Sequence, residues 1–163
     1  MLYFKKRCFA IALLFCVSNA FGQRLNTTFT EDLSRWDYDG NTYRTVFSDD
    51  WDNWTCAGYS IRTAFSNDWD NWKAGGDVTV RTVFSDDFGS WEIKGHGKTI
   101  RVRTTFNDDY ERWSVSGDAE GTIRTVFSKG FERWDVDVDF NGISKDLEIA
   151  IVFIPIFTAF HLN

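Results

Sequence analysis

The chain has 163 residues, of which 43% are hydrophobic and 18% aromatic, and its formal net charge at pH 7 is -6. About 140 residues outside the N-terminal leader suffice for one domain with a real core. The acidic balance argues against nucleic acid and anionic membranes as partners, because their phosphates repel a negative surface.

Residues 1–22 have the pattern of a secretory signal peptide. Three basic residues at positions 5 to 7 precede an apolar run over positions 8–17, and small residues follow at Ser18, Ala20 and Gly22. The run is shorter than the 18 or so apolar residues that a membrane anchor needs. Cleavage after Ala20 or Gly22 would start the mature chain near Gln23. We therefore predict a secreted, periplasmic or cell-envelope protein with no transmembrane span.

Loss of this leader changes the charge and the cysteine content of the predicted mature protein. Three positive charges and no negative charge leave with it, so the formal net charge falls from -6 to -9. Cys8 and Cys16 leave as well, and Cys56 remains alone. An internal disulfide and a Cys/His metal cluster are then excluded, so we expect packing to stabilise the fold.

Residues 23–142 contain six copies of one short aromatic repeat. Each copy has a phenylalanine, a large apolar residue four positions later and a tryptophan seven positions later; from the second copy on, Arg-Thr begins three positions before the phenylalanine. The phenylalanines are Phe29, Phe47, Phe65, Phe84, Phe106 and Phe127, and the tryptophans are Trp36, Trp54, Trp72, Trp91, Trp113 and Trp134. Self-similarity with a period of about 20 residues is typical of repeat architectures.

Each copy has two stretches in which apolar and polar side chains alternate, as expected for half-buried strands. Tyr43, Thr45 and Phe47 share one face, whereas Arg44 lies on the other. Glycine-rich tight turns join each tryptophan stretch to the next arginine stretch, as at residues 39–41. The pattern predicts an all-β antiparallel meander of about 12 strands, curled or closed like a barrel. A β-solenoid is the alternative, although it would stack the repeated arginines about 4.8 Å apart.

The link from each phenylalanine to its tryptophan is predicted to be a single helical turn. Serine followed by aspartates, as at residues 48–50, is typical of a helix N-cap with carboxylates near the positive end of the dipole. The phenylalanine, the residue four positions later and the tryptophan would then share one buried face. In the fourth copy the expected buried residues are Phe84, Phe88 and Trp91, and the expected exposed residues are Arg81, Glu92 and Lys94.

Residues 143–163 form an apolar C-terminal segment that we expect to cap the array. Polar residues from Ser144 onward could begin a helix, and Pro155 would kink or stop it. The apolar run over 149–160 is too short to span a bilayer, which takes about 20 residues. We expect a buried final strand or a helix covering one end of the array; contact with a membrane or a partner is the alternative.

Paired acids in the links offer oxygen ligands of the kind that calcium prefers, which makes them weak metal candidates. They are Asp49, Asp50, Asp86, Asp87, Asp108 and Asp109. A capped helical turn explains these acids without a metal, and no EF-hand loop is present. We therefore predict neither a metal site nor a cofactor.

The aromatic residues of successive links could form a row that stacks on sugar rings. They are Trp51, Trp69, Phe88, Tyr110 and Phe131. Their spacing places them on the same side as the core phenylalanines and tryptophans, so core packing is the leading interpretation. The repeated arginines are interpreted as a solvated strand face that pairs with acids across strands, with an anion site as the alternative.

No catalytic set is apparent. His96 and His161 lack a serine, cysteine or second histidine partner by motif, and six nearly identical repeats do not form the single asymmetric constellation that an active site needs. The leading hypothesis is an exported, non-enzymatic repeat protein that provides a structural or binding surface, with a glycan or an envelope protein as candidate partner. A carbohydrate-binding module using the link aromatics is the alternative, and a carboxylate-based hydrolase is a third.

Overall fold

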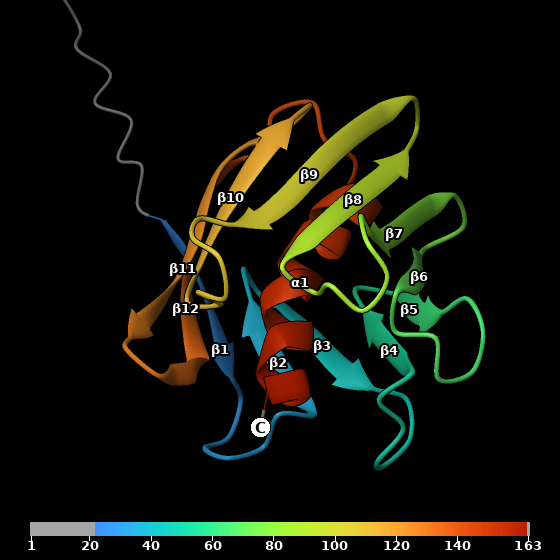
Figure 1. The fold of residues 1–163 in the computed structure, drawn as a ribbon. Helices are drawn as coiled ribbons and strands as arrows, with labels where there is room; N and C mark the ends of the chain where they lie inside the picture. The colour runs from blue at the N-terminus through green and yellow to red at the C-terminus, as the bar shows by residue number, and fades with distance from the viewer. Residues whose placement is uncertain (1–21, 163) are drawn as a thin grey trace, which may run out of the picture.

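The computed structural model, which describes residues 22–162, is a closed antiparallel barrel of twelve strands with one helix inside it (Figure 1). The strands are β1 (Gln23–Thr27), β2 (Arg35–Tyr38), β3 (Asn41–Thr45), β4 (Asn53–Cys56), β5 (Tyr59–Thr63), β6 (Asn71–Ala74), β7 (Val78–Thr82), β8 (Ser90–Gly95), β9 (Lys98–Thr104), β10 (Arg112–Gly117), β11 (Glu120–Phe127) and β12 (Gly130–Asp139). Each strand pairs with its chain neighbours, and β1 pairs with β12 to close the barrel. The predicted all-β meander is confirmed, and the solenoid alternative is wrong. The predicted signal peptide lies outside the described residues, apart from Gly22.

The turns from each tryptophan strand to the next arginine strand are tight because their residues adopt positive φ. In the β2–β3 turn Asp39 and Gly40 have φ of 46° and 73°, and in the β8–β9 turn His96 and Gly97 have φ of 51° and 74°. Two consecutive positive φ values match the right-handed twist of the flanking strands. These turns lie at one end of the barrel, called here the turn end.

The barrel interior is lined by the six repeat tryptophans, all of which are fully buried. Strand alternation places them inward and the arginines outward, as the period of two requires. A closed barrel of eight strands is just wide enough for side chains to fill, so twelve strands leave a wider interior that needs further apolar groups.

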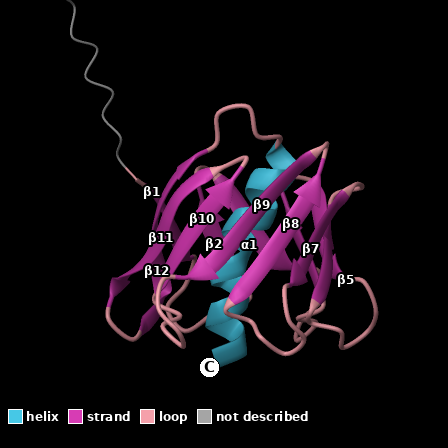
Figure 2. Ribbon diagram, turned by 45° about the horizontal axis from the view of Figure 1, so that its top comes forward, coloured by secondary structure: helices cyan, strands magenta, loops and turns pink. Residues whose placement is uncertain are grey.

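Those groups come from α1 (Lys145–Leu162), which runs through the barrel (Figure 2). The helix begins after Ser144, whose carbonyl accepts the Glu148 N–H at 3.0 Å, and it continues past Pro155 to Leu162. Every residue over 149–159 is buried. The predicted C-terminal segment is thus a helix and not a strand. It does not cover one end of the barrel, because it lies inside and fills the space between the tryptophans. No helix within residues 22–162 is long and apolar enough to cross a membrane.

Candidate functional site

The links between phenylalanine and tryptophan are tight turns, and the predicted helical turn is wrong. In the first five copies the phenylalanine carbonyl accepts the N–H three residues later, as in Asp50 N to Phe47 O at 3.3 Å. The second residue after each phenylalanine has positive φ, which fits a type II turn and is incompatible with a right-handed helix. These residues are Glu31, Asp49, Asn67, Asp86, Asp108 and Lys129.

This geometry turns all six repeat phenylalanines into solvent. Their side chains are between 59% and 74% exposed, so the expected burial of Phe84 is wrong. Trp91 is buried and Arg81 and Lys94 are exposed, as expected. Phe88 is only half-buried, and Glu92, which was expected to be exposed, is half-buried as well. Because equivalent positions of a closed barrel lie around one end, the phenylalanines form a ring of exposed apolar groups near the end opposite the turns. We call these six residues the phenylalanine belt, and the end that they surround the link end.

Each link is tied to the core by its tryptophan. The indole N–H of Trp91 donates to the Phe88 carbonyl at 2.7 Å, and the same bond recurs in every copy at 2.7–3.1 Å. A buried indole donor needs such a partner, and the link carbonyl supplies it without a side-chain acceptor.

The five link aromatics proposed as a sugar-binding row are half-buried at the link end, where they pack on the core. Three of them also contact the last turns of α1. Trp51 stacks on Phe160 with ring centroids 5.1 Å apart, and the Phe88 ring lies 4.5 Å from the His161 ring. Trp69 contacts His161 as well, at 5.5 Å. Tyr110 and Phe131 pack against the tryptophans of their own copies. These residues close the barrel mouth around the C-terminal end of the helix.

The paired acids of the links serve the turns themselves. The first acid of each pair adopts the positive φ, and the second accepts local hydrogen bonds. Asp87 accepts from the Gly89 N–H at 3.0 Å and Asp109 from the Glu111 N–H at 3.1 Å, while Asp50 accepts from the Asn53 amide at 2.8 Å. No group of three metal-ligating side chains occurs among the described residues.

The outer wall presents arginine at each of six junctions between neighbouring strands of successive copies. At each junction an arginine faces asparagine, serine or a second arginine, and never an acid. The pairs are Arg35 with Arg44, Asn53 with Arg62, Asn71 with Arg81, Ser90 with Arg103, Arg112 with Arg124, and Asn26 with Arg133. Of the two residues at each junction, one follows a belt phenylalanine by six positions and the other precedes the next belt phenylalanine by three positions, so each junction lies between two phenylalanines of the belt.

The predicted pairing of arginines with acids across strands is therefore only partly observed. Arg81 Nη2 lies 2.7 Å from Glu92 Oε1, and Arg124 Nη2 lies 3.9 Å from Asp135 Oδ2. Within residues 22–162, Arg44, Arg62 and Arg103 make no ion pair.

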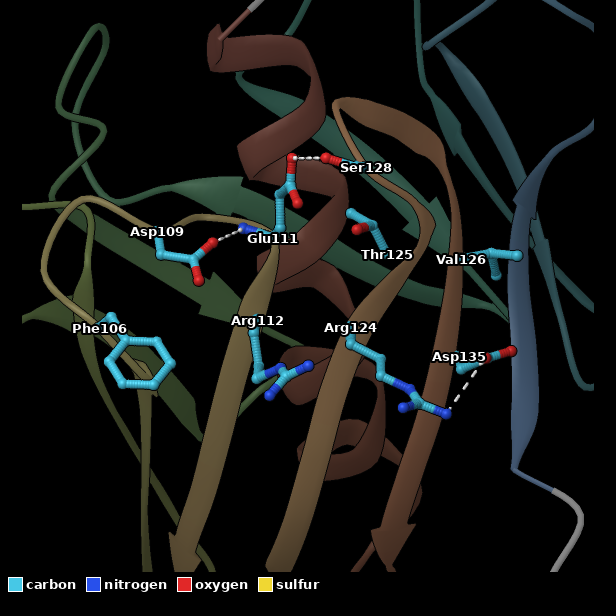
Figure 3. Close-up of a pocket in the computed structure, with 9 residues that line it drawn as sticks. All are labelled: Phe106, Asp109, Glu111, Arg112, Arg124, Thr125, Val126, Ser128 and Asp135. Carbon is cyan, nitrogen blue, oxygen red and sulfur yellow. Dashed lines mark hydrogen bonds and ion pairs between the residues drawn. The ribbon is translucent and has the colours of Figure 1, made fainter.

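Figure 3 shows one junction, where a hollow of about 490 Å³ opens on the outer wall beside β10 and β11. Phe106 and Arg112 lie next to each other on one side, with Arg124 beside Arg112. Glu111 is engaged by the Ser128 hydroxyl at 3.3 Å and the Lys129 N–H at 2.5 Å. The hollow thus combines an exposed phenyl ring with two guanidinium groups.

Cys56 and His161 are two further titratable side chains whose pKa is shifted by burial. Burial raises the pKa of the Cys56 thiol to about 11, so this cysteine is not a thiolate nucleophile at neutral pH. Burial also lowers the pKa of His161, which favours its neutral form beside Phe157. Among residues 22–162 neither side chain has an activating partner of the kind that covalent catalysis needs.

Comparison with family models, with curated proteins and with solved structures finds no match for this chain. The site is therefore defined by its own geometry. Sequence reasoning placed the belt in the core because the spacing of four and seven residues fits a helical face. The signal that it missed is the acid or asparagine two positions after most of the phenylalanines, since these residue types tolerate positive φ.

Proposed function

We propose that this is an exported, non-enzymatic repeat protein whose outer wall binds a polysaccharide along the phenylalanine belt. The observation that carries the proposal is the exposure of all six repeat phenylalanines. Exposed apolar groups gathered on one part of a protein surface usually mark an interaction site. Selection for folding alone gives no reason to keep a large apolar side chain in solvent at the same place in six copies.

The geometry of the belt fits a repetitive ligand. Equivalent residues of successive copies lie two strands apart, about 10 Å around the wall, because neighbouring strands are about 4.8 Å apart. That distance is comparable with the length of a disaccharide unit. A phenyl ring can stack on the apolar face of a sugar ring, while the neighbouring arginine, asparagine and serine side chains can bond its hydroxyl groups.

Two further features support the non-enzymatic and exported parts of the proposal. The helix α1 fills the barrel interior, which leaves the outer wall as the surface for a ligand. The phenylalanines and arginines on that wall recur in near-identical form rather than as the one asymmetric set that an active site needs. The basic and apolar leader over residues 1–22 is typical of export. An external polysaccharide, as part of a cell envelope or its surroundings, would be accessible to such a protein.

Affinity electrophoresis in native gels containing single polysaccharides tests the proposal. We expect at least one neutral or acidic polysaccharide to retard the wild-type protein, and the triple variant Phe84→Ser, Phe106→Ser, Phe127→Ser to lose most of that retardation. A control with three exposed outer-wall polar residues changed, Ser60→Ala, Thr79→Ala, Thr122→Ala, should behave as wild type. Equal mobility of wild type and belt variant in every gel would refute binding along the belt.

The link aromatics remain a second position for glycan binding, favoured by their partial exposure around the barrel mouth. If the ligand stacks there, the belt variant keeps its retardation in the same gels. Substituting Tyr110→Ala together with Phe131→Ala should then abolish retardation, because these two rings contact no aromatic side chain of α1 within the described residues and can be removed without loosening the helix.

A further inference from the structure

A second hollow on the outer wall differs in charge from the one in Figure 3. It lies across β6 to β9 and has a volume of about 500 Å³. Three arginines and two carboxylates line it, a formal charge of +1, whereas the hollow of Figure 3 has two arginines and three carboxylates, a formal charge of -1. The chain as a whole carries -6, so the β6–β9 hollow is a local exception.

Both carboxylates of this hollow are already engaged by groups of the protein. Asp70 accepts hydrogen bonds from the Thr82 hydroxyl at 2.7 Å and from the Asp86 N–H at 3.1 Å. Glu92 Oε1 lies 2.7 Å from both Lys94 Nζ and Arg81 Nη2. Hydrogen bonds from these two cations lower the pKa of Glu92, so it is ionised and committed to them.

Two arginines of β9 line this hollow, and Arg101 lies opposite Glu92 of β8, which is already paired with Arg81 and Lys94. Arg101 and Arg103 occupy successive outward positions, about 6.6 Å apart along the strand. Arg103 faces Ser90 on one neighbouring strand and Ser114 on the other, so hydroxyl groups rather than carboxylates flank it. Within the described part of the chain neither guanidinium makes an ion pair.

We propose that this hollow binds the anionic group of an acidic polysaccharide, a carboxylate or a sulfate, with Arg101 and Arg103 as its ligands. The inference rests on the proposed binding function and assigns it a ligand class. Guanidinium forms paired hydrogen bonds to such oxygens. Val83 is 38% exposed and lines the same hollow next to Phe84 of the belt, so the sugar ring that carries the anion would have an apolar contact.

The negative charge of the whole chain does not prevent this binding. Charges more than a Debye length away, about 8 Å at physiological ionic strength, are largely screened. The two carboxylates within the hollow are offset by Arg81 and Lys94 or held by hydrogen bonds. What an incoming anion meets at short range is therefore the pair of free guanidinium groups.

The test compares binding of the full mature chain to dextran, to dextran sulfate and to polygalacturonate by affinity electrophoresis. Dextran is neutral and dextran sulfate carries sulfate groups on the same polymer, so this pair shows the effect of the anion. Polygalacturonate carries carboxylates instead, so it shows which of the two anionic groups is preferred. We expect at least one of the anionic polymers to bind more tightly than dextran, and Arg101→Gln and Arg103→Gln each to weaken that binding about tenfold. The matched control Arg24→Gln, at an exposed arginine of β1 outside both hollows, should leave it unchanged, and added salt should weaken it.

Each other outcome decides against the assignment. If Arg24→Gln weakens binding as much as Arg103→Gln does, general surface charge is responsible and the hollow is not a site. If dextran binds as tightly as the anionic polymers, and the belt variant loses that binding, the anionic ligand class fails while the proposed function stands. If no polysaccharide retards the protein, both fail. Since all three arginines are exposed, unfolding curves should show that the variants remain folded.

Discussion

Each repeat tryptophan has two structural roles: it packs in the core and it holds the link in place. Its ring fills the barrel beside α1, and its indole N–H bonds the carbonyl three residues earlier. The bond fixes the path of the link, and the link in turn places the phenylalanine of the belt in solvent. The invariant spacing of core tryptophan and link aromatic therefore has a direct structural cause.

Trp91→Phe is expected to destabilise the protein by about 2–4 kcal/mol. The smaller ring leaves a void in a closely packed interior, and the Phe88 carbonyl loses its donor. The measurement is the free energy of unfolding from urea denaturation. Phe84→Ser serves as the control, because this ring is 67% exposed and its loss should change stability by about 0.5 kcal/mol or less. A larger loss for Phe84→Ser than for Trp91→Phe would contradict the observed register.

Among the secondary-structure elements, the strands and their hairpin order were predictable from sequence, whereas the links were not. Alternation such as Tyr43, Arg44, Thr45 and the glycine turns fix strand order locally. Serine followed by two aspartates, however, suits both a helix N-cap and a turn with positive φ, since short polar side chains stabilise either. In the fold the link is a positive-φ turn whose carbonyl accepts the indole N–H of the tryptophan, a tertiary contact that the local sequence pattern does not reveal.

The helix α1 is also held at the turn end by an ion pair. His96 Nε2, in the β8–β9 turn, lies 2.7 Å from Asp146 Oδ2 in the first turn of the helix. The hydrogen bond to Asp146 raises the pKa of His96, and Asp77 adds to this effect. Burial tends to raise the pKa of Asp146, but hydrogen bonds involving Ser144 and His96 outweigh it and the pKa is lowered.

These shifts predict how the contribution of the pair depends on pH. Because the folded-state pKa of His96 is raised, its stabilisation is fully present below the unfolded value of about 6.5 and is lost as pH rises through the folded pKa. Because that of Asp146 is lowered, its stabilisation is present above the unfolded value of about 3.9 and is lost as pH falls through the folded pKa. The difference in unfolding free energy between wild type and His96→Gln should thus be largest between the two unfolded values, about 3.9 and 6.5, and should shrink as pH rises through the raised folded-state pKa of His96. A difference that stays constant from pH 5 to 9 would show that the pair does not stabilise the helix.

For the molecule as a whole, the order of the chain sets a constraint on folding. The last element in sequence occupies the centre of the barrel, so the strands must close around a helix that is made after them. Sequence reasoning identified the apolar tail and its role in covering apolar surface, but it could not place the tail inside. The tail fits inside because a barrel of twelve strands is wide enough to hold a helix. That width is set only when β1 pairs with β12 and closes the barrel, which is a long-range contact.

Removing residues 143–163 should therefore abolish the fold rather than expose one end. The barrel would lose the buried side chains of α1, each large one contributing roughly 1.5–3 kcal/mol, and the six tryptophans would surround a void about as long as the helix. A wide apolar void cannot be closed by relaxation of a hydrogen-bonded barrel, and a protein of this size has only about 5–15 kcal/mol of net stability. The truncated chain should aggregate or bind a hydrophobic dye, with no cooperative thermal transition. Supplying residues 143–163 as a separate peptide during refolding should restore the transition if loss of the filling is the cause. A truncated chain that stays soluble and unfolds at the wild-type temperature would show that the repeats are stable without the helix.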